Sequence, residues 1–219
     1  MSAGEGLTVA LSKGRLFAGT AALFARAGLP FPEGETRRLV VDCGALRFLF
    51  VKDMDVPVYV EHGVADLGVA GRDVLLESQC DVYEPLDLGF GRCAIVVACL
   101  PAARAGLLRG ASVRVASKYA RVAGAHFRER GLSPEVVRLS GSVEIAPGLG
   151  LSDCIVDVAE SGRTLRENGL EVVDQVATSS ARLIVNRAAY HARRARVSAL
   201  IEALARAAAA PPEGREARP

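Results

Sequence analysis

DCIVDVAESGRTL, residues 153–165, joins an apolar run, an acid and a polar turn in one short stretch. Cys154, Ile155 and Val156 form the apolar run, which is typical of a strand buried on both faces of a sheet. Asp157 follows at the predicted carboxyl end of this strand, where open α/β sheets bind their ligands. A carboxylate at this place can accept hydrogen bonds from vicinal ribose hydroxyls. The stretch therefore predicts an α/β fold with a sugar site at a strand end.

The turn that follows Asp157 contains groups that bind a phosphate. Ser161 and Thr164 carry hydroxyls, Gly162 lets the backbone approach a ligand, and a helix predicted over residues 164–168 begins with free backbone N–H groups. The order DVxxSGxT is similar to the phosphoribosyl-pyrophosphate loop of phosphoribosyltransferases. An ordinary strand-to-helix turn uses the same residue types, so both interpretations stay open on this stretch alone.

Two charged side chains lie within the same turn. Arg163 adds positive charge near a bound phosphate, although we expect the backbone amides to contribute more. Glu160 would repel a phosphate, so its side chain is expected to turn toward the ribose or a metal ion. A solvated turn carboxylate is the alternative interpretation of Glu160.

The composition indicates a globular protein without a basic surface for nucleic acid. The 219 residues are 50% hydrophobic, and 27 basic residues nearly balance 25 acidic ones. The basic residues are spread along the chain, whereas nucleic-acid binding requires a basic patch or stripe, so no nucleic-acid partner is expected. The only lysines are Lys13, Lys52 and Lys118. Where Arg fills the general surface role, a Lys indicates a need for a compact ammonium.

The cysteines and the N-terminal segment predict a soluble cytoplasmic protein. The cysteines are scattered and form no CxxC pair, which favours buried thiols in a reducing compartment. Residues 1–15 have no basic region before their short apolar stretch and no cleavage-site pattern after it. The longest later apolar run, residues 94–101, is far shorter than a membrane span, so no membrane contact is expected.

Strands and helices alternate along the chain, which predicts two α/β lobes. Residues 90–92 precede a long apolar strand and a stretch rich in Pro, Ala and Gly, and they mark the boundary between the lobes. We assign residues 1–92 and 178–205 to lobe I, which the last strand rejoins. Residues 93–177 form lobe II, and residues 206–219, without an apolar pattern, form a disordered tail.

Two segments with the same pattern suggest how the lobes are arranged. Residues 63–73 and 150–161 each run from a helix end through an Asp and a buried strand to a polar turn. This pseudo-symmetry predicts two lobes that face each other across a central cleft. The predicted strands are 7–11, 39–43, 47–51, 66–70, 93–100, 113–117, 135–139, 154–156, 171–177 and 181–186, and the predicted helices are 16–27, 55–62, 73–77, 119–130 and 164–168.

Several uncommon motifs follow in order along nearly the whole chain, and together they resemble the ATP phosphoribosyltransferase family. The motifs are LSKGRLF (11–17), DVPVYVEHGVADLGVAGRDVLLE (55–77), DLGFGRC (87–93), ASKY (116–119), LSGSVEIAP (139–147), DCIVDVAESGRTLRENGL (153–170) and SARLIVN (180–186). The resemblance implies a fold similar to type II periplasmic binding proteins. It also implies the condensation of ATP with phosphoribosyl pyrophosphate in the first step of histidine biosynthesis, with Mg²⁺ bound to the substrates.

The resemblance is to the short form of the family, since little more than a helix follows Asn186. Short-form members need a separate regulatory subunit related to histidyl-tRNA synthetase, so the resemblance implies a hetero-oligomer. The chain departs from the family pattern at Ser12, Lys52 and Ser161, where Pro, Arg and Thr are usual. The cation at Lys52 and the hydroxyl at Ser161 are retained, and Ser12 only loosens its turn.

The family reaction requires cations for the departing pyrophosphate. Lys13 and Arg15 lie in the turn after the first predicted strand, and Lys52 follows the strand over residues 47–51, so these three are the candidates. A solvated turn is the alternative for Lys13 and Arg15. Arg37 and Arg38 belong to a charged loop, which is more typical of an exposed surface than of a site.

The remaining candidates concern the two substrates. Asp157 is assigned to the ribose hydroxyls and the turn from Glu160 to Thr164 to the 5-phosphate of phosphoribosyl pyrophosphate. Glu144, Gly71 and Asp73 lie in turns after strands and are possible nucleotide-binding residues. The alternative for Glu144 is that it completes a helix start, and turn geometry explains Gly71 and Asp73 nearly as well. No cluster of carboxylates predicts a dedicated metal site, so Mg²⁺ is expected to arrive with the phosphates.

Three other functions fit parts of the sequence. A ligand-binding module shares the two-lobed fold, but such proteins carry a signal peptide or a DNA-binding helix pair, and neither is predicted here. Phosphoribosyl transfer to another acceptor fits the phosphate loop equally well. A catalytically silent homologue is disfavoured by the intact loop.

Overall fold

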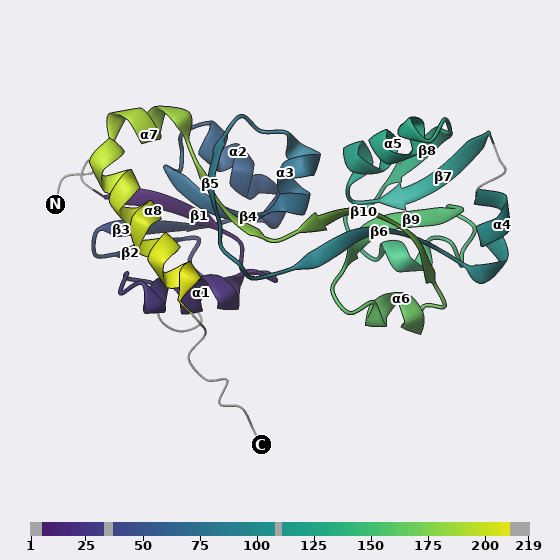
Figure 1. Cartoon of the computed structure of the whole chain (residues 1–219), viewed down its shortest axis with the longest axis horizontal. Helices are drawn as coiled ribbons and strands as arrows, with labels where there is room; N and C mark the ends of the chain where they lie inside the picture. Colours follow the sequence, from purple (N-terminus) through teal and green to yellow (C-terminus); the bar gives the residue numbers. More distant parts are fainter. Residues whose placement is uncertain (1–5, 33–36, 108–110, 211–219) are drawn as a thin grey trace, which may run out of the picture. The chain divides into compact units, whose positions relative to one another are not determined.

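The computed structural model describes residues 6–32, 37–107 and 111–210 (Figure 1). The chain divides into two compact units. The first unit contains Met1–Gly71, Cys80–Gly91 and Ser180–Pro219, and the second contains Arg72–Gln79 and Arg92–Ser179. Both units combine helices with one sheet, which confirms the predicted two-lobed α/β fold.

The first unit contains a six-stranded mixed sheet of order β2-β3-β1-β4-β11-β5. Its central strand β1 is parallel to β3 and β4, and the remaining pairs are antiparallel. The strands are β1 (Leu7–Leu11), β2 (Val40–Cys43), β3 (Leu46–Phe50), β4 (Leu67–Gly71), β5 (Tyr83–Asp87) and β11 (Ala181–Val185). The helices are α1 (Phe17–Arg26), η1 (Asp53–Asp55), α2 (Val56–Glu61), α7 (Arg187–Ala192) and α8 (Arg194–Ala209).

An aromatic cluster holds α1 against the sheet of the first unit. Phe24 and Phe48 are fully buried, and their ring centroids lie 5.7 Å apart in an edge-on arrangement. Phe31 lies 5.2 Å from Phe48 and completes the cluster. Tilted and edge-on aromatic contacts of this kind stabilise a core beyond the area they bury. Figure 1 shows α8 beside α1, and Leu204 on α8 is fully buried.

The second unit contains a five-stranded sheet of order β10-β6-β9-β7-β8. Strands β7, β8 and β9 are parallel, and β6 runs antiparallel to β9 and β10. The strands are β6 (Cys93–Cys99), β7 (Ser112–Ser117), β8 (Ser133–Arg138), β9 (Cys154–Ala159) and β10 (Glu171–Ser179). The helices are α3 (Arg72–Ser78), η2 (Pro101–Ala103), α4 (Arg104–Leu107), α5 (Ala120–Glu129), η3 (Val143–Ile145) and α6 (Arg163–Glu167).

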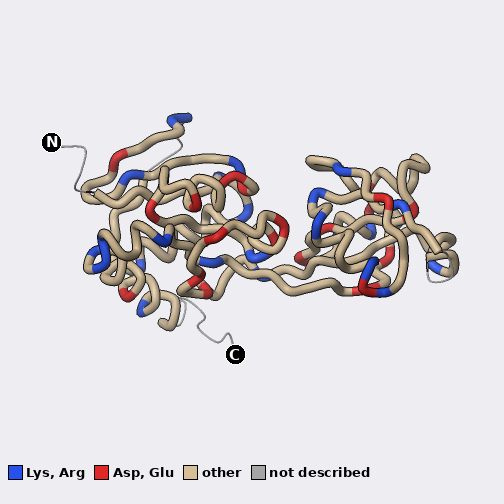
Figure 2. Tube along the Cα trace, turned by 90° about the horizontal axis from the view of Figure 1, so that it is seen from above, with Lys and Arg blue, Asp and Glu red and all other residues tan. Residues whose placement is uncertain are grey.

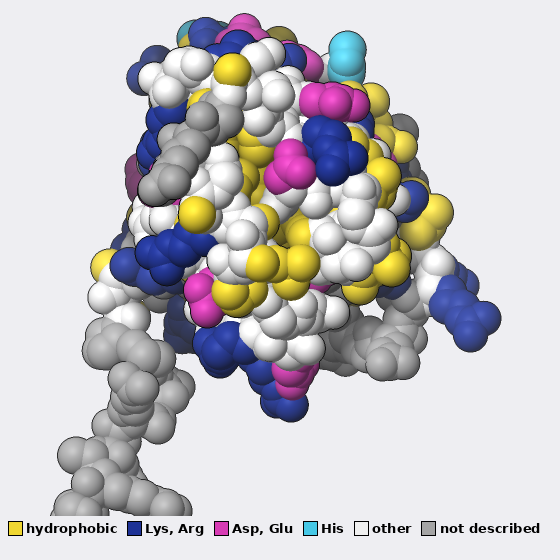
Figure 3. Space-filling model, turned by 90° about the vertical axis from the view of Figure 1, so that its right-hand side faces the viewer, with side chains coloured by type: hydrophobic (Ala, Val, Ile, Leu, Met, Phe, Trp, Pro, Cys, Tyr) yellow, Lys and Arg dark blue, Asp and Glu magenta, His cyan; other side chains and the backbone are white. Residues whose placement is uncertain are grey.

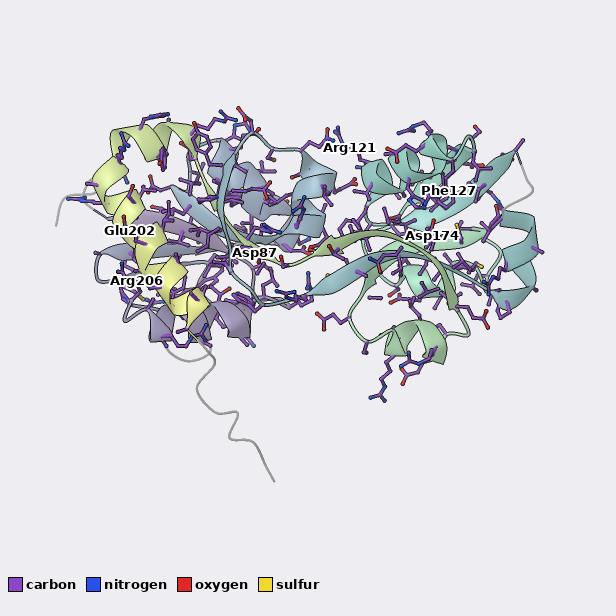
Figure 4. All side chains as sticks on the ribbon, viewed as in Figure 1. Asp87, Arg121, Phe127, Asp174, Glu202 and Arg206 are labelled. Atoms are coloured by element: carbon purple, nitrogen blue, oxygen red, sulfur yellow. The ribbon has the colours of Figure 1, made fainter. Side chains whose placement is uncertain are left out.

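The central strands of the second sheet are buried on both faces, which explains their continuous apolar sequence. Along β6, Ile95 and Val97 belong to one core cluster, whereas Val96 and Ala98 belong to another. The first cluster includes Phe127 of α5, which Figure 4 labels. Successive side chains of a strand point to opposite faces, so a central strand with two buried faces has no polar alternation.

Strand β9 is longer than the sequence predicts. The apolar run ends at Val156, but the strand continues to Ala159 because β6 pairs with it as far as Ala94. Asp157 is therefore opposite Val96 within the strand and not at its end. Strand β5 was not predicted at all: its sequence YEPLD is largely polar and contains Pro85, which only an edge strand tolerates.

The structure groups residues 72–79 with the second unit, whereas the sequence analysis places them in lobe I. Hydrogen bonds explain the difference. The Asp73 carboxylate accepts hydrogen bonds from Ser179 and Tyr119, and Glu77 accepts the backbone N–H of Arg121. Burying these carboxylates requires such partners, so α3 remains with the unit that supplies them.

The predicted tail over residues 206–219 begins too early. Helix α8 continues to Ala209, and Ala207 is buried in the core of the first unit. Ala210 has the extended backbone that a residue before proline favours, which ends the helix. The rest of the predicted tail, residues 211–219, lies outside the described residues.

Asn186 joins three segments of the first unit, and its loss should destabilise the protein. Its side chain accepts the Ala189 N–H at 2.8 Å as the cap of α7, and donates to the carbonyls of Val60 and Glu61 at 2.8 and 3.0 Å. We expect Asn186→Ala to lower the free energy of unfolding by about 1–3 kcal/mol in urea titrations.

The matched control for this prediction is Asn168→Ala. Asn168 is exposed, and its side chain donates to the Thr164 carbonyl at 2.9 Å. A surface substitution of this kind should change stability by less than about 0.5 kcal/mol. An equal loss in both variants would contradict a special role for the buried contacts of Asn186.

Candidate active site

The turn from Glu160 to Thr164 joins β9 to α6 in the second unit. Gly162 has φ +67°, the left-handed conformation that favours glycine, and it directly precedes the helix. The Ser161 carbonyl accepts a hydrogen bond from Arg166 at 3.0 Å, and the Ser161 hydroxyl lies 3.4 Å from the Arg163 nitrogen. The turn is thus held by the helix that follows it. The predicted strand-to-helix turn is present, and its binding of a phosphate stays a prediction.

Arg163 is directed along its own helix and not into the turn. Its Nε donates to Glu167 Oε1 at 2.7 Å, an ion pair between positions four apart on α6. Both side chains are exposed, so the pair contributes little to stability. The backbone N–H groups of this turn therefore remain the better candidates for phosphate contacts than the Arg163 side chain.

Asp157 carries the most perturbed carboxylate of the candidate site. Burial raises the pKa of Asp157 to about 6, and the charges of Glu144 and Asp73 act in the same direction. The Val158 N–H, which donates to Asp157 Oδ1 at 2.8 Å, and the charge of Lys118 lower it. A half-buried carboxylate with a strongly shifted pKa is characteristic of a functional site.

Lys118 lies close enough to Asp157 to lower the pKa of that carboxylate, although no role is predicted for it from the sequence. It follows β7, whose last residue Ser117 is opposite Val156 in the parallel β7–β9 pair. Lys118 therefore lies at the same sheet edge as Asp157, and its charge acts on that carboxylate. The available signal was its position directly after a predicted strand, together with the rarity of lysine in this chain.

Glu144 is also brought to this edge of the second unit. It lies in η3, after β8, and its carboxylate raises the pKa of Asp157. Ser142, the residue directly before η3, is one of the non-glycine residues with positive φ, at +51°. Such conformations cost free energy and often mark functional turns.

Asp73 and Gly71 have positions that favour different roles. Asp73 is buried, with 2% of its surface exposed, and both of its carboxylate oxygens accept hydrogen bonds from hydroxyl groups of the second unit. This arrangement favours a structural task for the carboxylate. Gly71 ends β4 in the first unit, where β4 runs parallel to β1. The nucleotide-binding role of both residues stays a prediction.

The two lysines predicted to bind pyrophosphate, Lys13 and Lys52, lie at one edge of the sheet of the first unit. Strands β1 and β3 are parallel, with Leu11 opposite Phe50, and the Val51 N–H donates to the Leu11 carbonyl at 2.9 Å. Lys13 and Lys52 each follow their strand by two residues, so their turns are neighbours. The Lys13 ammonium lies 4.7 Å from the centroid of the Phe50 ring, a favourable cation–π distance.

Arg15 and Ser12 shape the same turn. An Arg15 guanidinium nitrogen donates to the Gly91 carbonyl at 2.7 Å, so this cation connects two segments of the first unit. The Ser12 hydroxyl accepts the Gly14 N–H at 3.1 Å, and the serine side chain thereby orders the turn. Arg37 and Arg38 lie on an exposed segment before β2.

The charged side chains are mixed in both units. Figure 2 shows Lys and Arg interspersed with Asp and Glu over the trace. On the face seen in Figure 3, hydrophobic side chains lie among charges of both signs. Within the residues that the structure describes, no group of three or more His, Cys, Asp or Glu side chains could hold a metal ion. None of the helices in the same residues is long and apolar enough to span a bilayer.

The sequence is similar to those of several known proteins. The sequence model of the family described as HisG, ATP phosphoribosyltransferase, matches residues 52–206. An ATP phosphoribosyltransferase of Symbiobacterium thermophilum is 49% identical over 209 residues, which cover 90% of this chain and 93% of that protein. An ATP phosphoribosyltransferase of Anaeromyxobacter dehalogenans is 50% identical over 220 residues, which cover 98% of both chains.

The fold of the chain is similar to that of a solved structure as well. A chain of the ATP phosphoribosyl transferase (HisG:HisZ) complex from Thermotoga maritima superposes with a TM-score of 0.81 at 32% sequence identity. The superposition covers 92% of this chain and 98% of that one. The fold is therefore similar to that of periplasmic binding proteins, as the sequence predicts.

Proposed function

Because the chain belongs to the ATP phosphoribosyltransferase family, we propose that its second unit binds phosphoribosyl pyrophosphate through Asp157 and the Glu160–Thr164 turn. The family catalyses the first step of histidine biosynthesis, the transfer of a phosphoribosyl group to ATP with release of pyrophosphate. The observation that carries our assignment is the half-buried Asp157 carboxylate with its raised pKa, which lies three residues before a turn with a left-handed glycine at a helix start.

The residues of the second unit position the ribose. Ionised Asp157 accepts hydrogen bonds from the vicinal ribose hydroxyls, and the backbone N–H groups at the start of α6 bind the 5-phosphate. The transition state resembles an oxocarbenium ion, as in glycosidic-bond chemistry generally. Little acid or base catalysis is needed for such a displacement, so orientation of the anomeric carbon is the main contribution of these groups.

The candidate residues of the first unit stabilise the negative charge of the leaving group. Lys13 and Lys52, on neighbouring turns, stabilise the negative charge that develops on departing pyrophosphate. Arg15 supports the Lys13 turn through its hydrogen bond to Gly91. Gly71, at the same sheet edge, allows the backbone to approach the adenine nucleotide whose N1 nitrogen attacks the sugar.

Magnesium is expected to bind together with the substrate, through its phosphates. Mg²⁺ prefers to keep several waters and to bind substrate phosphates together with few protein oxygens. The residues of the second unit fit that mode, since Asp157 and Glu144 provide carboxylate oxygens at the same edge without forming a dedicated cage. A bound Mg²⁺ would supply further charge neutralisation at the pyrophosphate.

A partner subunit and a cytoplasmic location complete the proposal. The similar chain from Thermotoga maritima belongs to a HisG:HisZ complex, and this chain covers 98% of its length. We infer that this chain likewise assembles with a HisZ-type regulatory subunit, and that histidine feedback acts through that subunit. A biosynthetic enzyme that uses ATP belongs in the cytoplasm.

The test is an assay with ATP, phosphoribosyl pyrophosphate, Mg²⁺ and pyrophosphatase, with and without the cognate regulatory subunit. Phosphoribosyl-ATP is followed by its ultraviolet absorbance, and we expect product together with a change in rate when the subunit is added. Free purine bases in place of ATP should give no product. Product from another acceptor would contradict the choice of ATP, and no product in any mixture of folded protein would favour a binding module.

A further inference from the structure

The segment Ser117–Tyr119 places the third lysine of the chain beside Asp157. Lys118 is half-buried, and its charge is the only positive one among the groups that act appreciably on the pKa of Asp157 in the described structure. The other charged groups that face Asp157 are the carboxylates of Glu144, from η3, and Asp73, from α3. Without a cation, these three acids would repel a substrate that is itself strongly anionic.

The backbone around Lys118 is fixed to the strand that carries Asp157. The Ser117 hydroxyl donates to the Val156 carbonyl at 2.6 Å and accepts the Tyr119 N–H at 2.8 Å. Ser117 is fully buried. One hydroxyl therefore ties the turn after β7 to the residue directly before Asp157, which fixes the position of the Lys118 backbone relative to that carboxylate.

Tyr119 fixes the side chain of Lys118 from the other direction. Its ring centroid lies 5.8 Å from the Lys118 ammonium, within the range of a cation–π contact. Its hydroxyl donates to Asp73 Oδ2 at 2.7 Å, and the ring is 2% exposed. Asp73 is in turn held by Ser179, whose hydroxyl donates to Asp73 Oδ1 at 2.6 Å. The ring is therefore locked, and it presents a fixed face to the lysine.

We propose that Lys118 is a further binding residue for phosphoribosyl pyrophosphate, in contact with a phosphate oxygen next to the ribose, and that Tyr119 is the residue that positions it. An ammonium offers three donors and acts on phosphate as a compact charge. The inference rests on the proposed assignment of Asp157 to the ribose. The inference gives the ASKY segment, residues 116–119, a role in substrate binding in addition to its role in the fold.

The first test compares Lys118→Met with Arg104→Met in the complete enzyme with its regulatory subunit. Arg104 is an exposed residue of the same unit, paired with Glu171 at 3.9 Å, and it controls for the loss of one charge. We expect Lys118→Met to raise the KM for phosphoribosyl pyrophosphate about tenfold or more and to leave the KM for ATP within about twofold. A KM equal to that of Arg104→Met would overturn the role of Lys118.

The pH profile adds a readout that a structural role would not move. Lys118 lowers the pKa of Asp157, so Lys118→Met should shift the acid limb of kcat/KM for phosphoribosyl pyrophosphate to higher pH. Arg104→Met should leave the limb in place. An unshifted limb in Lys118→Met would show that the ammonium does not act on the site.

The role of Tyr119 is tested by a double-mutant cycle. Tyr119→Phe keeps the ring and removes the hydrogen bond to Asp73, and it should raise the KM for phosphoribosyl pyrophosphate about threefold. In the Lys118→Met background the same change should have no further effect, because Tyr119 acts through Lys118. If Tyr119→Phe raised the KM by the same factor with and without Lys118→Met, the positioning role of Tyr119 would be overturned. All assays are run below the lowest melting midpoint, so that unfolding does not enter the KM.

Asp157→Asn, measured beside these variants, separates this inference from the proposed function. A raised KM in Asp157→Asn with a normal one in Lys118→Met would refute only the inference about Lys118. A normal KM in Asp157→Asn would refute the ribose assignment from which both start.

Discussion

Replacing Asp157 with Asn is expected to raise the KM for phosphoribosyl pyrophosphate by roughly 10²- to 10⁴-fold while it makes the substrate-free protein more stable. The loss in binding follows from two hydrogen bonds between a charged acceptor and the ribose hydroxyls, each worth about 1.5–3 kcal/mol. Asn keeps the size of the side chain and can still accept the Val158 N–H through its Oδ1. The KM for ATP should change little.

The gain in stability follows from the pKa of Asp157, which burial raises from 3.8 to about 6. The folded protein binds this proton more tightly than the unfolded chain does, so ionisation of Asp157 opposes folding. The cost is fully present above about pH 7, shrinks as the pH falls through about 6, and is absent below about pH 4. Asn cannot ionise, so Asp157→Asn should gain up to roughly 3 kcal/mol at pH 8 and nothing below about pH 4.

Urea unfolding of both proteins at pH 8 and near pH 4 measures this difference. The matched control is Asp153→Asn on the same segment, since Asp153 Oδ2 accepts the Arg114 N–H at 2.7 Å and its side chain pairs with Arg114 at 3.3 Å. That substitution should not stabilise the protein at either pH. If Asp157→Asn were destabilising at pH 8, the carboxylate would be a structural group and the ribose assignment would lose its physical basis.

The same pKa predicts the pH dependence of binding. Only the ionised carboxylate accepts two hydroxyl donors, so affinity for phosphoribosyl pyrophosphate should fall as the pH drops through about 6. The substrate phosphates titrate in the same range, near pH 6. In Asp157→Asn, the affinity should depend on pH only through the titration of the substrate phosphates. Identical profiles for the two proteins would mean that Asp157 does not titrate in the step that binds this substrate.

The order of strand, turn and helix around Asp157 was predictable because its signals are local, although β9 continues past the predicted end at Val156 to Ala159. An apolar run, an acid, a left-handed glycine and a helix start follow one another within 153–165, and each has one simple structural meaning. The positions of Lys13 and Lys52 were predictable for the same reason, since each lies in the turn after an apolar strand. What could not be predicted is that β1 and β3 are parallel neighbours, because strand order depends on packing over the whole unit.

The missed features depend on contacts between distant segments. The hydrogen bond from Ser117 to Val156 spans 39 positions, and the one from Ser179 to Asp73 spans 106. Neither position has a local pattern that points to its partner. The link between Lys118 and Asp157 is of this kind, and so is the grouping of α3 with the second unit. Strand β5 was missed for another reason, since an edge strand with a proline lacks the apolar alternation that marks a strand.

Replacing Lys13 with Met is expected to lower the rate of phosphoribosyl transfer about 10²-fold and to change the affinity for either substrate by less than about threefold. The ammonium follows β1 and lies 4.7 Å from the Phe50 ring, so its position is set before substrate binds. Preorganised charge of this kind acts where charge develops, and removal of one such group typically costs about 10²–10³ in rate. Methionine retains the apolar stem against Phe50.

Single-turnover formation of phosphoribosyl-ATP, followed by ultraviolet absorbance, separates this step from release of products. Arg194→Met removes one exposed positive charge from α8 of the same unit, and it should leave the rate unchanged. If Lys13→Met weakened substrate binding as much as it slowed transfer, the lysine would bind ground state and transition state equally, and its role would be that of an anchor. The proposed role requires that the rate falls and the affinity stays, because charge on pyrophosphate appears only as the glycosidic bond breaks.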